Sequence, residues 1–260
     1  QTKAVMKIVI SPAKSMNFDV DTSSLEYSTI PFQKETEGLA KKMSKFSGKK
    51  LEKMMGISTQ LGELNHDRYQ NFHLTETPSE NVKQAGAIFT GEVYRGLDFL
   101  SLDKEGANLA QEKLRILSGL YGIVRPLDLI HAYRLEMGTK WAITPKTKNL
   151  YAFWGSKIAE ALNEEMEENE ALINLASNEY FKAVDQKVFH GKIITPHFKE
   201  NKNGAYKIVM MFAKNARGKM ARFIIENNIT NPEEIKTYEV DGYVFNSEQS
   251  TESDWVFTRG

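Results

Sequence analysis

The segment 213–227 carries one of the strongest groups of cations in the sequence. On a helix, Lys214, Gly218 and Arg222 would recur at intervals of four residues and share one face. Arg217 would lie beside them. Gly218 costs a helix interior roughly 1 kcal/mol relative to alanine, so close packing or the approach of a ligand must account for it. The pattern predicts a phosphate-binding helix, and the alternative is a solvated basic face.

A second basic group precedes a predicted tight turn. Lys49, Lys50 and Lys53 belong to a short helix that ends near Gly56, and Ser58 can cap the helix that follows. Backbone amides at such a turn, and at the start of the second helix, can face a phosphate. The segment therefore predicts a helix-hairpin-helix element that contacts DNA without reading its sequence. An ordinary helical hairpin with a basic side is the alternative.

A third group places charges among apolar neighbours. Arg125 and Asp128 lie in one such stretch, and Arg134 and Glu136 follow in the next. Charges in apolar surroundings must be paired, because an unpaired buried charge is very costly. The pairing predicts either a structural salt-bridge network or a catalytic group in which a carboxylate acts as general acid or base.

Polar residues also lie at the carboxyl ends of two expected strands. Ser11 and Lys14 follow the apolar run Met6–Ile10. The end of a second strand, expected over Ala171–Ala176, offers further candidates: Asn174, Ser177, Glu179, Tyr180 and Lys182. Ligands of open α/β sheets bind at the carboxyl ends of strands, so both segments are predicted to border a site. Ser177 alone is more simply explained as a helix N-cap.

Strands and helices alternate along the chain, which predicts an α/β, or mixed α+β, fold. We expect one compact domain over residues 6–258, with a central sheet, surrounding helices and a helical hairpin insert at about residues 35–72. Helices are expected over Glu80–Phe89, capped by Ser79, and over Tyr151–Asn169. A β-hairpin is expected from residues 192–198 and 205–212.

Composition narrows the classes of function. The 34 basic and 34 acidic residues balance, so any attraction to an anion must be local. Cysteine is absent and the five histidines are scattered, so neither a disulfide framework nor a metal site is predicted. No dinucleotide fingerprint or P-loop is present, and we assign no cofactor. Without a long apolar run or a signal-peptide pattern, the predicted location is the cytoplasm, with no membrane partner.

Several ordered blocks of the sequence together resemble the YaaA peroxide stress resistance family, from Met6 to about Phe257. These blocks include residues 10–14, 89–96, 117–122, 125–129, 133–138, 153–155, 173–182, 216–218 and 222–227. The sequence departs from the family where Ala132 replaces a usual proline and Asn215 a common lysine.

The resemblance implies a single mixed α/β fold with a positively charged cleft, a helix-hairpin-helix element and DNA binding. It also implies a role in surviving hydrogen peroxide by limiting free iron and the damage that iron causes to DNA. The leading hypothesis is a stress protein that binds DNA, as duplex or distorted duplex, with a monomer favoured. The alternative is an enzyme acting on a nucleotide or nucleobase, with Arg125, Asp128, Arg134, Glu136 and Glu179 converging on one pocket.

Overall fold

The computed structural model describes residues 4–260, with side chains from Met6 onward, and an eight-stranded sheet forms its centre. The order along the sheet is β4-β3-β1-β6-β7-β10-β9, and β8 pairs with β7 outside this path. The strands are β1 (Ala4–Ile10), β3 (Leu114–Ser118), β4 (Gly122–Val124), β6 (Met166–Leu175), β7 (Lys192–Lys202), β8 (Ala205–Lys207), β9 (Val244–Phe245) and β10 (Asp254–Arg259). A separate two-stranded sheet joins β2 (Val82–Gln84) to β5 (Leu129–His131).

The five inner strands β3, β1, β6, β7 and β10 run parallel, so their carboxyl ends meet at one edge of the sheet. On β1, Met6, Ile8 and Ile10 are completely buried, as is Val9 on the other face. Burial on both faces is what a continuous apolar run predicts for a central parallel strand. The predicted mixed α/β fold is confirmed.

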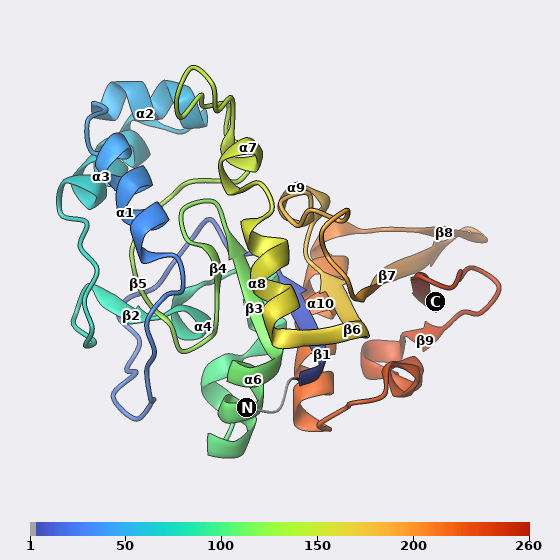
Figure 1. Ribbon diagram of the computed structural model, residues 1–260. Coiled ribbons are helices and arrows are strands. Elements are labelled where there is room, and N and C mark those ends of the chain that lie inside the picture. Colours follow the sequence, from blue (N-terminus) through green and yellow to red (C-terminus); the bar gives the residue numbers. More distant parts are fainter. Residues whose placement is uncertain (1–3) are drawn as a thin grey trace.

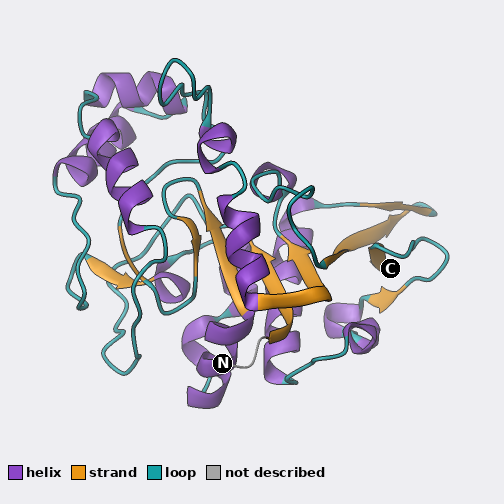
Figure 2. Ribbon diagram, viewed as in Figure 1, coloured by secondary structure: helices purple, strands orange, loops and turns teal. Residues whose placement is uncertain are grey.

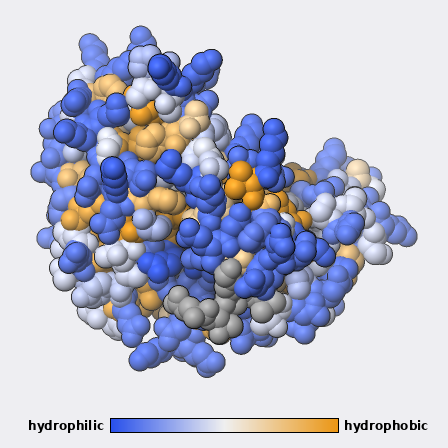
Figure 3. Space-filling view, in the orientation of Figure 1, coloured by the Kyte–Doolittle hydropathy of each residue, from blue (hydrophilic) through white to orange (hydrophobic). Residues whose placement is uncertain are grey.

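Helices surround this sheet (Figures 1 and 2). In Figure 1, α8 lies in front of the central strands and α10 lies behind them. The helices are α1 (Gln33–Met43), α2 (Gly48–Met55), α3 (Thr59–Gln70), α4 (Ala85–Ile88), α5 (Glu92–Leu97), α6 (Lys104–Lys113), α7 (Leu150–Trp154), α8 (Lys157–Glu165), α9 (Asn178–Phe181) and α10 (Met210–Glu226). Short 3₁₀ turns cover Phe99–Ser101, Pro232–Thr237 and Val240–Gly242. The face seen in Figure 3 is mostly hydrophilic, with apolar residues showing in patches.

The helix expected over Glu80–Phe89 is wrong in its first half. Val82–Gln84 forms β2, which pairs antiparallel with β5, and only Ala85–Ile88 is helical. Ser79 does not cap a helix, because its backbone amide bonds to the carbonyl oxygen of Val82 in an isolated bridge. A pairing with a strand about 47 residues further along the chain therefore overrides the local helical pattern.

The single helix expected over Tyr151–Asn169 is also wrong. It is divided into α7 and α8 at Gly155, whose φ of 50° lies in the left-handed region that ends helices. From Met166 the chain is a strand, because β6 pairs with β1 at Met166 and, after a register shift, from Ala171 through Leu175. The amphipathic pattern is correct for α8, in which Ile158 and Leu162 are buried.

The expected β-hairpin at residues 192–212 is correct in position and wrong in its second strand. β7 extends to Lys202, but β8 covers only Ala205–Lys207. Helix α10 begins at Met210, which leaves Ile208 and Val209 as a short connection.

One cluster of buried charges is paired, as apolar surroundings predict. Arg115 donates to both carboxylate oxygens of Glu165 at 3.1 Å, and the Lys7 ammonium lies 3.4 Å from the same carboxylate. Burial, and secondarily the Arg115 charge, lowers the pKa of Lys7 to about 8. This cluster stabilises the contact of β1 and β3 with the end of α8.

Candidate functional site

A cleft opens at the carboxyl ends of β1 and β6. Ser11 directly follows β1, and Ser177 lies just beyond β6, where its hydroxyl accepts from the Tyr180 amide as the N-cap of α9. The Ser177 amide donates to Oγ of Ser11 at 2.8 Å. The Tyr94 hydroxyl donates to the Ser11 carbonyl oxygen at 2.8 Å, so α5 is bonded to the same point. This is the edge at which open α/β sheets bind ligands.

The cleft has a volume of about 470 Å³ and brings together segments far apart in the sequence. Its walls come from the loop after β1, the start of α5, the loop after β5, α9 and the start of α10. The predicted site residues that line it are Ser11, Lys14, Glu136, Ser177, Glu179, Tyr180, Lys214 and Arg217. The structure therefore unites the two strand-end segments with part of the basic helix.

Arg217 is the least exposed of the cations that line the cleft. Its side chain is half-buried, and among residues 4–260 it has no ion pair or hydrogen-bond partner. Burial lowers its pKa, although a guanidinium stays protonated at any physiological pH. Lys214, one helical turn earlier, is exposed and its ammonium likewise has no partner in the described chain. A partly desolvated, unpaired guanidinium favours an anionic ligand.

The loop after β5 brings an acidic group to the cleft, among cations. Oε1 of Glu136 lies 3.2 Å from the Lys14 ammonium and 3.6 Å from Nη2 of Arg134. The same oxygen is buried, and neither it nor Nε of Arg134 has a well-aligned hydrogen bond within the described residues. The side chain as a whole is 27% exposed and lines the cleft, so its carboxylate borders the space that a ligand would occupy.

Glu179 connects α9 to the loop that carries Glu136. Its Oε2 accepts from the Gly138 amide at 2.9 Å, and the Tyr151 hydroxyl donates to its carbonyl oxygen at 2.6 Å. A Cβ at position 138 would lie 2.8 Å from the same carboxylate, so only glycine allows this approach. One carboxylate oxygen of Glu179 thus holds the loop, and the residue still borders the cleft.

Arg125 and Asp128 do not line the cleft. Asp128 is completely buried and accepts hydrogen bonds from the Ser28 hydroxyl at 2.6 Å and the Arg125 amide at 2.7 Å. The Arg125 guanidinium donates to Asp128 at 2.9 Å and also to the Thr29 carbonyl oxygen. The structure therefore favours the structural alternative for this pair: it anchors the segment around Ser28 to the turn before β5.

Gly218 and Arg222 lie on α10 but face α5. A Cβ at Gly218 would overlap the Val93 carbonyl oxygen, so close packing explains this glycine and the helix surface there is covered. Arg222 donates to the carbonyl oxygens of Leu97 at 2.9 Å and Asp98 at 2.7 Å, and pairs with Glu226. The anion site expected along the whole helix face is therefore reduced to its first turns.

The predicted helical hairpin lies away from the cleft, beside α1 (Figure 1). Gly56 ends α2 in the left-handed conformation with φ 63°, and the Ser58 hydroxyl caps α3 by accepting from the Leu61 amide. The three lysines, Lys49, Lys50 and Lys53, are exposed. The two helices and the turn between them are present, and both a helix-hairpin-helix element and its contact with phosphate stay predictions. Lys182 follows α9, is exposed and does not line the cleft.

Sequence reasoning missed the segment Thr90–Tyr94, which forms one wall of the cleft. Gly91, with φ 102°, turns the chain into α5 and could have marked this loop as a special backbone position. Reasoning also missed the exposed apolar residues at the start of α10, because they looked like the buried half of a strand.

Within the described residues, no group of three or more histidine, aspartate and glutamate side chains is arranged to hold a metal ion. None of the helices in residues 4–260 has both the length and the apolar character required to cross a bilayer.

Comparison with known proteins gives a consistent result over nearly the whole chain. A protein-family model described as peroxide stress protein YaaA matches residues 6–249. A UPF0246 protein of Alteromonas mediterranea is 49% identical over 256 residues, which cover 98% of each chain. UPF0246 proteins of Saccharophagus degradans and Flavobacterium johnsoniae are 48% and 45% identical, covering 98% of this chain and 99% and 100% of their own lengths.

Proposed function

Since the chain belongs to the peroxide stress protein YaaA family, we propose that it takes part in the oxidative stress response by binding DNA largely without sequence specificity. The phosphates of one strand would occupy the cleft. Binding in the cytoplasm would help to limit iron-dependent damage to the DNA, which is the cellular role that the resemblance implies.

The unpaired guanidinium of Arg217 is the observation that carries this proposal. A phosphate supplies charged acceptor oxygens that would satisfy it, and the exposed Lys214 lies one turn away for the same or a neighbouring phosphate. Lys14 adds a third cation, although Glu136 already pairs with it. Contacts of this kind hold the backbone and carry no sequence information.

The helical hairpin would provide a second and separate contact. Lys49, Lys50 and Lys53 are exposed on α2, and the first amides of α3 follow the Ser58 cap. A duplex long enough to reach both regions would gain additional phosphate contacts, each of which releases counterions. We therefore expect affinity to increase with the length of the DNA and to fall steeply with salt.

The double variant Lys214→Gln/Arg217→Gln tests the cleft. Because two phosphate contacts are lost, the slope of log affinity against log salt should decrease in magnitude by roughly 1.8, and affinity near physiological salt should fall at least about tenfold. The measurement is fluorescence anisotropy of a labelled short blunt duplex across a salt series.

Arg222→Gln is the matched control, because it removes a cation from the same helix outside the cleft. It should leave the salt slope unchanged while lowering the free energy of unfolding by about 1–3 kcal/mol, since the carbonyl oxygens of Leu97 and Asp98 lose their donor. An unchanged slope in the double variant, or no binding of the wild-type protein at low salt, would exclude the proposal.

The second candidate is an enzyme that acts on a nucleotide or nucleobase in the same cleft. The observation in its favour is that Glu136 and Glu179 line the same cleft as Arg217, so carboxylates and an unpaired guanidinium share one cavity. Glu136 would serve as general acid or base, because its side chain is partly exposed where it lines the cleft. Arg125 and Asp128 have no part in this arrangement.

Glu136→Gln separates the two candidates. The substitution keeps the shape of the side chain and removes its proton-transfer capacity, so any release of base, nucleoside or phosphate from DNA should fall by about 100-fold or more. DNA affinity should stay within about threefold of wild type or increase slightly, because an acidic charge leaves the cleft. If neither protein forms product under chromatography, the enzyme candidate is wrong and DNA binding remains.

A further inference from the structure

Exposed apolar side chains are concentrated at the start of α10. Of the large hydrophobic residues that are exposed in the described part of the chain, five lie between positions 206 and 212: Tyr206, Ile208, Met210, Met211 and Phe212. Met211 is the most exposed of them, at 57%. We name Ile208, Met210, Met211 and Phe212 the apolar ridge. Apolar groups gathered in this way on a surface mark a site of interaction.

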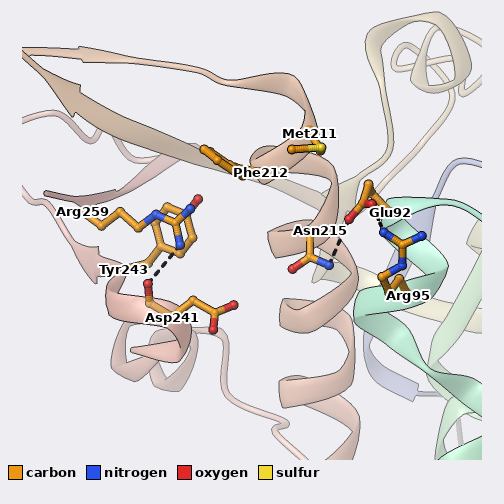
Figure 4. A pocket seen from close by; sticks show the side chains of 8 residues that line it. All are labelled: Glu92, Arg95, Met211, Phe212, Asn215, Asp241, Tyr243 and Arg259. Carbon is orange, nitrogen blue, oxygen red and sulfur yellow. Dashed lines mark hydrogen bonds and ion pairs between the residues drawn. The ribbon is translucent and has the colours of Figure 1, made fainter.

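The ridge separates the cleft from a second cavity. Met210 lines the cleft described above, close to Lys214 and Arg217 on the same helix. Met211 and Phe212 line a neighbouring cavity of about 340 Å³, whose other walls include Tyr243 and Arg259 (Figure 4). A ligand held in the cleft would therefore have the ridge directly beside it.

The Phe212 ring is held in place on one side. The Arg259 guanidinium lies 5.1 Å from the centre of this ring and 4.3 Å from the centre of the Tyr243 ring (Figure 4). Arg259 is itself fixed by Glu200 at 2.5 Å and by the Asp241 carbonyl oxygen at 3.0 Å. The ring nevertheless stays 40% exposed. It therefore offers a positioned aromatic surface at a low cost in side-chain entropy.

The charges around the ridge favour an anionic partner. The nearby acids are already used: Glu92 pairs with Arg95, and Asp241 with Lys219. By contrast, the ammonium groups of Lys207 and Lys214, which flank the ridge in the sequence, are exposed and have no partner within residues 4–260. Apolar and aromatic surfaces between unpaired cations are the combination with which proteins bind single-stranded nucleic acid.

We propose that the apolar ridge binds unpaired nucleobases of a DNA strand whose phosphates occupy the cleft. This inference rests on the proposed DNA binding and adds to it a preference for DNA with exposed bases. A base-paired duplex keeps its bases stacked inside, so it can reach the cations but not the ridge. Four side chains are too few to form the roughly 1,200 Å² interface that a stable protein partner needs, whereas each base requires only one apolar surface.

The test compares a blunt duplex with a duplex of equal phosphate number that contains a short unpaired segment labelled with 2-aminopurine. The wild-type protein should bind the second DNA more tightly and quench the fluorescence of the label. In Met211→Ser/Phe212→Ser, quenching should disappear and affinity for the unpaired DNA should fall roughly 5- to 100-fold. Affinity for the blunt duplex and its salt slope should stay unchanged, because no cation is altered.

Leu100→Ser is the matched control, since Leu100 is an exposed apolar residue outside both cavities, and it should bind both DNAs as the wild type does. Met211→Ser alone preserves the contact between Phe212 and Arg259 and should still reduce quenching if the double variant proves unstable. Equal losses for both DNAs, or unchanged quenching, would overturn the inference. So would a wild-type dimer that becomes a monomer in the double variant, because the ridge would then join two copies.

If the proposed DNA binding itself is wrong, the binding measurements will give a different result. In that case the wild-type protein would bind neither DNA at low salt, or the Lys214→Gln/Arg217→Gln variant would bind both normally. Binding of blunt duplex that depends on the cleft, without any preference for unpaired bases, would preserve DNA binding and exclude the role of the ridge.

Discussion

Gly218→Ala is expected to destabilise the protein by more than about 4 kcal/mol, a loss large enough to leave much of it unfolded. Helices α5 and α10 cross with their backbones in close contact, and a Cβ at position 218 would overlap the Val93 carbonyl oxygen. The obstacle is backbone, so no side-chain rotation can remove it. Gly96 repeats the arrangement from the other helix, because a Cβ there would overlap the Asn215 carbonyl oxygen.

Urea unfolding followed by circular dichroism measures this effect, with Gly38→Ala as the matched control. Gly38 lies inside α1, and no atom lies within 4 Å of the position that its Cβ would take. The control should be neutral or more stable by up to about 1 kcal/mol, as helix propensity predicts. If Gly218→Ala retained wild-type stability, the close crossing of α5 and α10 would be incorrect.

Asp128→Ala is expected to cost about 3–5 kcal/mol, because it removes one partner of a buried ion pair. The Ser28 hydroxyl, the Arg125 amide and the Arg125 guanidinium would all lose their acceptor. Asp128→Asn keeps the shape and some of these bonds, so its cost should be smaller.

The decisive measurement pairs the free energy of unfolding with DNA affinity. Since Asp128 does not line the cleft, affinity per folded molecule should be unchanged while stability falls. The exposed Asp19→Ala should change neither quantity. A loss of affinity or turnover in Asp128→Ala at wild-type stability would instead restore this residue to the functional site.

Local sequence predicts those elements whose signals are contained within a few residues. Ser58 caps a helix as expected, because its side chain accepts from an amide only three positions away. The buried run that forms β1 is recognisable for the same reason. By contrast, the glutamate-rich segment after Glu165 looks helical, yet it lies within β6, which pairs with β1 on either side of that segment, at Met166 and from Ala171 onward. That information lies about 160 residues away in the chain.

The candidate site also combines features that local sequence predicts with features that depend on distant parts of the chain. The meeting of Ser11 with Ser177 is predictable, since both follow strands of a parallel sheet. The different roles of Arg217 and Arg222 are not, although the residues are five positions apart on one helix. Arg222 finds the carbonyl oxygens at the end of α5, and Arg217 finds none. Only the crossing of the two helices decides which cation remains available.

The interlocked glycines of α5 and α10 also bear on how the cleft can move. Thr90–Tyr94 forms one wall and Lys214 and Arg217 another, and both walls belong to the two helices that Gly96 and Gly218 hold in backbone contact. We therefore expect α5 and α10 to move as one rigid unit. The distance between the cleft walls that they form should stay constant, because no hinge separates the two helices. Under the proposed DNA binding, a strand entering the cleft would have to adapt to the protein, so the deformability of the DNA would govern the rate of binding.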